Sequence, residues 1–142
     1  MDILYQDTRI VVAVKPAGVV STDEPGGMPE LLRAHLHTDC IRTVHRLDAQ
    51  VAGVMVFARS RVAASLLSQQ IREHRFSKEY LAVLCGTPTQ PADTLTDLLA
   101  RDTRRRVTYV ADAPSPDTRE ARLFYDTVDS ADGLTLVRVR LH

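Results

Sequence analysis

Short apolar runs that end at proline or glycine are the feature that most constrains how this chain of 142 residues folds. The predicted strand Arg9–Val14 is rich in valine, and Lys15-Pro16-Ala17-Gly18 ends it. Proline cannot donate to a sheet ladder, and glycine permits a sharp turn. Another run, at residues 134–141, follows the segment Asp129-Ser-Ala-Asp132-Gly133, which is a good hairpin signal. These patterns predict strands joined by tight turns.

The rest of the chain alternates between similar strands and two helices. A helix is expected over Pro29–Leu36, with proline in its first turn, and another over Arg61–His74, capped by Ser60, with residues 63, 66, 67, 70 and 71 close to one face. Further strands are predicted at residues 2–5, 41–44, 51–58, 78–84, 105–110 and 119–127. Many strands in hairpin order with two helices predict an α+β fold with a largely antiparallel sheet.

The length of the chain fits one domain, residues 1–142, that buries its own core. Hydrophobic residues make up 44% and charged residues 25%, so a globular protein is expected and not a disordered one. Residues 134–141 form an apolar strand that stops at His142 without a polar finish. We therefore expect this domain to be truncated at its C-terminus.

Composition and the N-terminus point to a cytoplasmic protein. The two cysteines, Cys40 and Cys85, are too few for a disulfide framework and fit free thiols in a reducing compartment. The N-terminal residues do not have the pattern of a signal peptide. No apolar run approaches the roughly 20 residues that cross a bilayer, so no membrane partner is expected.

The balance of charge leaves the partner open. The net charge is zero, which argues against a protein that binds nucleic acid non-specifically. Residues 45–80 nevertheless carry six basic and three acidic groups, and Arg104, Arg105 and Arg106 form a second basic cluster. A solvated surface with ion pairs is the more common interpretation of such segments.

Two motifs have simpler interpretations than a ligand site. His35-x-His37-x-x-Cys40 resembles part of a metal site, but no further Cys or His pair has suitable spacing, so no metal is expected. Lys15-Pro16-Ala17-Gly18 lacks the glycine pattern of a phosphate-binding loop and is interpreted as a turn.

Three stretches together resemble the RluA-like family of RNA pseudouridine synthases. They are residues 3–18, which end in Lys-Pro-x-Gly; residues 44–59, which contain His45-Arg46-Leu47-Asp48; and residues 78–86, which contain Lys-x-Tyr. The four-residue motif alone recurs by chance, but three motifs in the same order and spacing are specific. The resemblance covers essentially the whole chain and implies a pseudouridine synthase-like fold.

The chain departs from the family's pattern in two places. Val51-Ala52-Gly53 stands where the family usually has Thr-Ser-Gly, which replaces two hydroxyls by apolar groups. The family's strand that corresponds to residues 134–141 continues into a basic Gly-Arg-x-His-Gln-x-Arg segment, whose arginine pairs with the catalytic aspartate. This chain ends before that segment, and the catalytic domain is therefore expected to be incomplete.

The resemblance implies isomerisation of uridine to pseudouridine in ribosomal or transfer RNA. The reaction involves no redox change, so no cofactor is expected. Asp48 is the expected catalytic carboxylate, as a nucleophile at C1′ or a base at C2′, and both routes remain open. An aspartate with a pKa of about 3.9 is already ionised at neutral pH, so a cationic partner would mainly orient it.

Further site residues follow from the same resemblance. Tyr80 is the second expected catalytic residue, with its ring against the detached uracil. Arg46 is expected to fill the space that a flipped base leaves, and His45 and Leu47 to fix the loop. Candidates for contacts with RNA phosphates are Arg59, Arg72, Arg75, Arg104, Arg105 and Arg106.

Two alternatives remain beside the enzyme. One is a non-catalytic RNA-binding or ribosome-assembly module that retains the fold, and the other is an inactive fragment of the enzyme. The absent arginine segment favours these alternatives, whereas Asp48 and Tyr80 favour the enzyme. The sequence predicts no oligomeric state.

Overall fold

The chain divides into two compact units. The computed structural model describes all residues, 1–142, and the two units are Met1–Arg75 and Phe76–His142. All strand pairs in both units are antiparallel, and two helices accompany them. The predicted α+β class with a largely antiparallel sheet is therefore confirmed.

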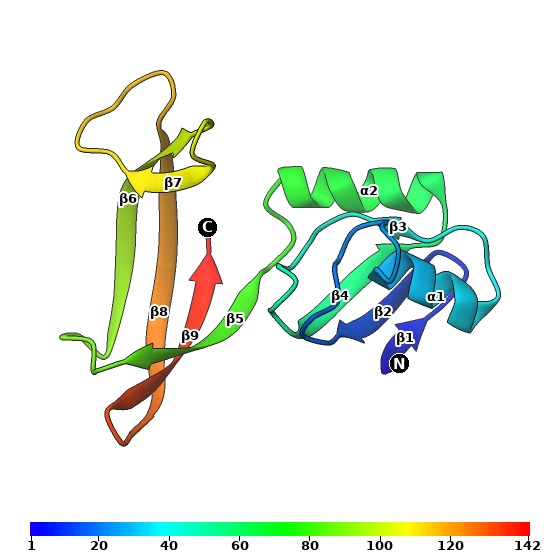
Figure 1. Ribbon diagram of the computed structural model, residues 1–142, viewed down its shortest axis with the longest axis horizontal. Helices are drawn as coiled ribbons and strands as arrows, with labels where there is room; N and C mark the ends of the chain where they lie inside the picture. Colours follow the sequence, from blue (N-terminus) through cyan, green and yellow to red (C-terminus); the bar gives the residue numbers. More distant parts are fainter. The chain divides into compact units, whose positions relative to one another are not determined.

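The first unit is a four-stranded sheet with both helices (Figure 1). Its strands lie in the order β1-β2-β4-β3. The strands are β1 (Ile3–Gln6), β2 (Ile10–Lys15), β3 (Arg42–Thr43) and β4 (Gly53–Ala58), and the helices are α1 (Met28–Leu36) and α2 (Arg61–Arg72). The predicted strand at residues 51–58 begins two residues late, because residues 51 and 52 belong to the loop before β4.

The core of this unit lies between α1 and one face of the sheet. Alternate residues of β2 and β4 point to this face, and the register places Val11 opposite Phe57 and Ala13 opposite Met55. Helix α1 contributes Met28 and Leu32, both fully buried. Leu47, in the loop before β4, packs against the same cluster. The core thus holds one end of the segment that carries Asp48.

Helix α2 begins where the sequence predicts and ends earlier. The hydroxyl of Ser60 accepts a hydrogen bond of 3.1 Å from the amide of Ala63, which makes Ser60 the N-cap. The helix ends at Arg72 and not at His74, whose φ of 53° is left-handed. Of the expected apolar face, Ala63 is buried while Leu66 is 54% exposed. Neither helix is long and apolar enough to span a bilayer.

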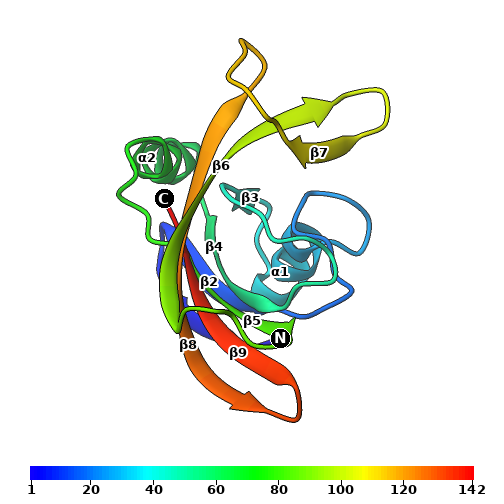
Figure 2. The ribbon, with the colours of Figure 1, turned by 90° about the vertical axis from the view of Figure 1, so that its left-hand side faces the viewer.

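The second unit is a five-stranded sheet in the order β5-β9-β8-β6-β7 (Figures 1 and 2). Its strands are β5 (Glu79–Cys85), β6 (Ala92–Asp102), β7 (Val107–Val110), β8 (Arg119–Ala131) and β9 (Leu134–Leu141). The turn between β8 and β9 consists of Asp132 and Gly133, with φ values of 52° and 75°, as a tight hairpin requires.

Two features of this sheet were not predicted. Strand β6 was missed, although it has 11 residues and pairs with both β8 and β7. Strand β8 continues past its predicted end at Thr127, through an irregularity between Thr127 and Asp129, to Ala131. Strand β6 joins the sheet by pairing with β7 and β8, and the additional residues of β8 pair with the first residues of β9 across the hairpin.

Close packing before α1 predicts unequal effects for two neighbouring glycines. A β-carbon added to Gly27 would lie 2.3 Å from the carbonyl oxygen of Thr22, so the backbone has to move. A β-carbon on Gly26 meets nothing within 4 Å, and only the φ of 75° opposes it, at a cost of about 1–2 kcal/mol. We expect Gly27→Ala to lower the free energy of unfolding more than the control, Gly26→Ala. Urea unfolding followed by circular dichroism measures both, and the reverse order would contradict the packing described.

Candidate active site

Asp48 lies in the loop between β3 and β4, with its side chain exposed. The loop is turned at this point, because the carbonyl of Asp48 accepts a hydrogen bond of 3.0 Å from the amide of Val51. Arg46, two residues earlier, is also exposed. The first unit therefore presents the predicted carboxylate and the predicted arginine to solvent from one short segment.

A buried lysine holds the segment after Asp48. Lys15 ends β2 and is 0% exposed, and its ammonium donates hydrogen bonds to the carbonyls of Pro16 at 3.0 Å, Val19 at 2.6 Å and Ala49 at 3.0 Å. An ammonium has three donors, so all three are used. The carbonyl of Ala49 also accepts from the amide of Gly18 at 2.8 Å. The residue after Asp48 is thus tied to the turn that follows β2.

The Asp48 carboxylate is the negative charge that acts on Lys15. Burial lowers the pKa of Lys15, and attraction to the Asp48 carboxylate opposes this shift. The cost of burying the amine is thus offset in part by three carbonyl oxygens and by a nearby negative charge. The sequence predicts Lys15 only as part of a turn. Neither its hydrogen bonds to three carbonyls nor its attraction to the Asp48 carboxylate was predicted.

Two side chains hold the segment before Asp48: Ser21, from the loop before α1, and His45, from the segment itself. The hydroxyl of Ser21 donates to the carbonyl of Leu47 at 2.6 Å and accepts from its amide at 3.0 Å. The Nε2 atom of His45 accepts a hydrogen bond of 3.1 Å from the amide of Val56 in β4. His45 and Leu47 therefore both take part in hydrogen bonds that hold the loop.

A glycine at the start of β4 leaves room for this arrangement. A β-carbon on Gly53 would lie 3.1 Å from the Cδ1 atom of Leu47, closer than most such contacts. Gly53 is the last residue of the segment Val51-Ala52-Gly53, in which the two preceding residues depart from the family's pattern. The glycine of that pattern is present in this chain, and its lack of a side chain leaves the space that Leu47 occupies.

Tyr80 belongs to the second unit, where it is half-buried on β5. The register places it opposite Val139 of β9, and Tyr125 follows on β8. Further along the same sheet, an apolar hollow of about 400 Å³ is lined by residues that include Leu84, Leu123, Tyr125, Val137 and Val139. The predicted catalytic tyrosine thus lies in a row of apolar side chains.

Ion pairs fix the strand pairing beside Tyr80. Glu79 points to the opposite face, and its carboxylate accepts a hydrogen bond of 2.9 Å from Arg140 and lies 3.7 Å from Arg138. The hydrogen bond from Arg140 is the main cause that lowers the pKa of Glu79. These contacts join β5 to β9 next to the tyrosine.

The predicted phosphate-binding arginines are in different environments. Arg59 donates a hydrogen bond of 2.7 Å to the carbonyl of Asp7, so its guanidinium holds the β1–β2 turn. Arg75 pairs with Glu73, and Arg72 is exposed at the end of α2. The guanidinium groups of Arg59 and Arg75 therefore have fewer donors left for RNA phosphates.

The second basic cluster forms an exposed turn. Arg104, Arg105 and Arg106 lie between β6 and β7, and Asp102 accepts hydrogen bonds of 2.9 Å from the amides of both Arg104 and Arg105. The Arg105 side chain is 85% exposed, although its Nε atom lies 3.8 Å from the Asp102 carboxylate. This turn presents three guanidinium groups to solvent.

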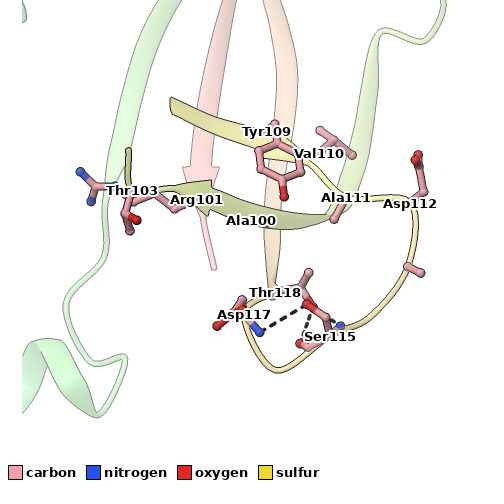
Figure 3. A pocket seen from close by; sticks show the side chains of 11 residues that line it. Ala100, Arg101, Thr103, Tyr109, Val110, Ala111, Asp112, Ser115, Asp117 and Thr118 are labelled. Atoms are coloured by element: carbon pink, nitrogen blue, oxygen red, sulfur yellow. Dashed lines mark hydrogen bonds between the residues drawn. The ribbon is translucent and has the colours of Figure 1, made fainter. Parts of the chain in front are cut away.

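A polar hollow of about 690 Å³ lies at the same end of the second unit (Figure 3). Tyr109 and Asp112 line it, and Ser115 and Thr118 close its rim with hydrogen bonds of 2.8 Å through the Thr118 hydroxyl. It contains neither Asp48 nor Tyr80. In the whole chain, no three His, Cys, Asp or Glu side chains are grouped so that they could hold a metal ion.

Comparison with known proteins decides the family. The family model described as RNA pseudouridylate synthase matches residues 9–142. The chain belongs to this family. The RluA-like resemblance is supported by the dual-specificity RNA pseudouridine synthase RluA of Escherichia coli K12, which is 38% identical over 107 residues and 68% of this chain.

Other pseudouridine synthase relatives match over nearly the whole chain. An uncharacterized RNA pseudouridine synthase of Bacillus subtilis, YhcT, is 29% identical over 99% of this chain. The chain spans 49% of that relative and 45% of RluA, about half of each. The structure of human RNA pseudouridylate synthase domain containing 4 has a TM-score of 0.81 and 22% identity, over 99% of this chain and 58% of that one. The likeness at this identity shows the same fold.

Removal of the buried ammonium tests its role in holding the Asp48 loop. Lys15→Met leaves the carbonyls of Pro16 and Val19 without their donor, so we expect the free energy of unfolding to fall by about 2–4 kcal/mol at pH 7. The pKa of Lys15 is lowered from 10.5, so the unfolded state binds more protons between the lowered pKa and 10.5.

Stability of the wild type relative to Lys15→Met should therefore rise with pH across that interval. Urea unfolding at a series of alkaline pH values measures both proteins. The role of the buried ammonium in holding the loop would be contradicted if the two proteins had the same free energy of unfolding at pH 7. A difference in free energy of unfolding that stays constant across the alkaline range would contradict the lowered pKa of Lys15.

Proposed function

We propose that the protein converts uridine to pseudouridine in structured RNA and that Asp48 carries the chemistry. The observation that supports this most directly is an exposed aspartate in a His-Arg-Leu-Asp loop, with Ser21 bonded to the backbone of the residue before it and Lys15 to the carbonyl of the residue after it. Fixed groups of this kind are what a reaction at one sugar carbon requires. Membership of the pseudouridylate synthase family supports the same reaction.

The proposed reaction is a rearrangement within one nucleotide. The bond from N1 of uracil to C1′ of ribose breaks, the base turns, and a bond forms between C5 and C1′. The proton on C5 is then lost and N1 gains one, so atoms and electrons balance without a redox partner. The sugar passes through an oxocarbenium-like state, which a nearby carboxylate stabilises.

Asp48 has two possible parts in this reaction. As a nucleophile it forms a bond to C1′ while the uracil turns, and as a base it removes the C2′ proton. The exposed position of its carboxylate suits either route, because both need direct access to the ribose. The Asp48 carboxylate attracts the Lys15 ammonium and partly offsets the lowering of the pKa of Lys15 by burial.

Tyr80 and Arg46 have supporting parts in the proposal. Tyr80 stacks against the detached uracil and assists the proton step at C5, and the apolar row around it suits a flat base. Arg46 is exposed and fills the space of the flipped nucleotide. Flipping a base from a structured RNA costs a few kcal/mol, which such contacts offset.

Electrostatic contacts to the RNA backbone are assigned to the exposed arginines. The stronger candidates are Arg72 and the exposed turn Arg104–Arg106, in which Arg105 has only a long contact with Asp102, whereas Arg59 and Arg75 make hydrogen bonds within the protein. We propose ribosomal or transfer RNA as the substrate and the cytoplasm as the compartment. The free thiols of Cys40 and Cys85 are consistent with that compartment.

The second candidate function is a non-catalytic RNA-binding or ribosome-assembly module. The observation that favours it is the exposed turn Arg104–Arg106, whose three guanidinium groups can contact RNA phosphates without any chemistry. Such a module would bind RNA through the same arginines and would not need the Asp48 carboxylate. The two functions therefore differ in their dependence on one charge.

Replacement of that carboxylate by an amide separates the two functions. In the protein as its gene encodes it, we expect Asp48→Asn to lower the rate of pseudouridine formation at least about a hundredfold, because the amide is neither a comparable nucleophile nor a base. RNA affinity should change little. The substrate is RNA prepared without pseudouridine. Because pseudouridine and uridine have the same mass, the RNA is digested to nucleosides, which are separated by liquid chromatography and counted by mass spectrometry.

Asp39→Asn is the matched control. Asp39 is another exposed aspartate of the first unit, and the substitution makes the same chemical change. It should leave the rate unchanged. Full activity of Asp48→Asn would refute the role of Asp48, and a wild type that binds RNA but forms no pseudouridine would favour the binding module.

A further inference from the structure

Ser21 forms an unusual pair of hydrogen bonds with the residue before Asp48. Its side chain is buried, with 3% of the residue exposed. One hydroxyl oxygen accepts from the amide of Leu47 at 3.0 Å and donates to the carbonyl of the same residue at 2.6 Å. A hydroxyl has one donor and two acceptor sites, so a single serine can satisfy both groups.

This pairing restricts the backbone of Leu47. The amide and carbonyl of one residue point to the same side only when that residue is extended. The hydroxyl of Ser21 therefore takes the place of a neighbouring strand at a position where the chain has none. The side chain of Leu47 packs against the core at the same time, so both its backbone and its side chain are held.

Ser21 is itself fixed in place. Its carbonyl accepts a hydrogen bond of 3.0 Å from the Thr43 hydroxyl of β3. The preceding carbonyl, of Val20, accepts 2.9 Å from the amide of Met28 at the start of α1. The serine is thus held between β3 and α1, and a movement of the Asp48 loop would break several contacts at once.

We propose that Ser21 is a positioning residue that sets the direction of the Asp48 carboxylate toward the ribose; this role rests on the proposed function. On the other side, the carbonyl of Asp48 accepts from the amide of Val51, and Lys15 and Gly18 hold the carbonyl of Ala49, so the backbone is anchored both before and after Asp48. Asp48 itself remains exposed. Ser21 does not touch the substrate in this arrangement.

The test compares the same substitution, serine to alanine, at two positions of the first unit. Ser21→Ala removes both hydrogen bonds to Leu47, and Ser60→Ala, the control, removes the N-cap bond of α2 in the same unit. Ser21→Cys keeps a group of similar shape with a weaker donor and acceptor. The protein as its gene encodes it is used throughout.

Three quantities are measured for each variant, at a temperature where all are folded. They are the single-turnover rate of pseudouridine formation at saturating RNA, the dissociation constant for RNA, and hydrogen exchange of the Leu47 amide. We expect Ser21→Ala to slow the turnover by about ten- to a hundredfold, because a displacement on the order of 1 Å has that effect on a reacting group. RNA affinity should stay within about twofold, and the Leu47 amide should exchange faster.

The remaining variants complete the pattern. Ser21→Cys should have an intermediate rate, and Ser60→Ala should have the rate of the wild type. A Ser21→Ala protein with the full rate, or one whose Leu47 amide exchanges as slowly as in the wild type, would overturn the positioning role alone. Equal slowing by Ser60→Ala would also overturn it. A wild type that forms no pseudouridine would instead overturn the proposed function, and this role with it.

Discussion

The buried ammonium of Lys15 is the interaction on which the architecture of the first unit depends. It comes at the end of β2, where the strand stops at proline, and joins three carbonyls, two of which have no other donor. These two carbonyls, of Pro16 and Val19, belong to the turn after β2, and the third, of Ala49, belongs to the loop that carries Asp48. An apolar side chain in place of Lys15 would fill the space but leave the carbonyls of Pro16 and Val19 unpaired, which costs free energy of folding. One charge therefore connects a strand end, a turn and the proposed catalytic loop.

The sequence predicts the elements whose signals are local. The valine-rich β2, the helix that begins near Pro29 and the Asp-Gly turn before β9 each follow from a few adjacent residues, and the structure confirms them. Strand β6 was missed because polar residues such as Asp93 and Asp97 interrupt its apolar pattern, and most of it is exposed. Its extended form comes from pairing with β8 and β7, an interaction that no short stretch of sequence encodes.

The site shows the same distinction. Asp48 could be named from a motif, because the family resemblance is carried by adjacent residues. Ser21 could not, since its partner Leu47 is 26 positions away and a serine in a polar loop has no distinctive signal. Arg59 was assigned to RNA from its charge, yet its guanidinium reaches 52 positions back to the carbonyl of Asp7. Long-range hydrogen bonds thus show which side chains hold the protein's own loops and turns, as Ser21 and Arg59 do. A short stretch of sequence does not distinguish them from side chains that are available to bind RNA.

In the proposed reaction, the Asp48 carboxylate contacts the ribose of the target uridine. The most direct measurement is a crystal structure of the protein as its gene encodes it, bound to an RNA in which fluorine replaces hydrogen at C5 of that uridine, so that no proton can leave C5. We expect a flipped nucleotide with C1′ or C2′ within about 3.5 Å of the Asp48 carboxylate, or bonded to it. A flipped nucleotide that lies against another carboxylate, while Asp48 stays in solvent, would contradict it.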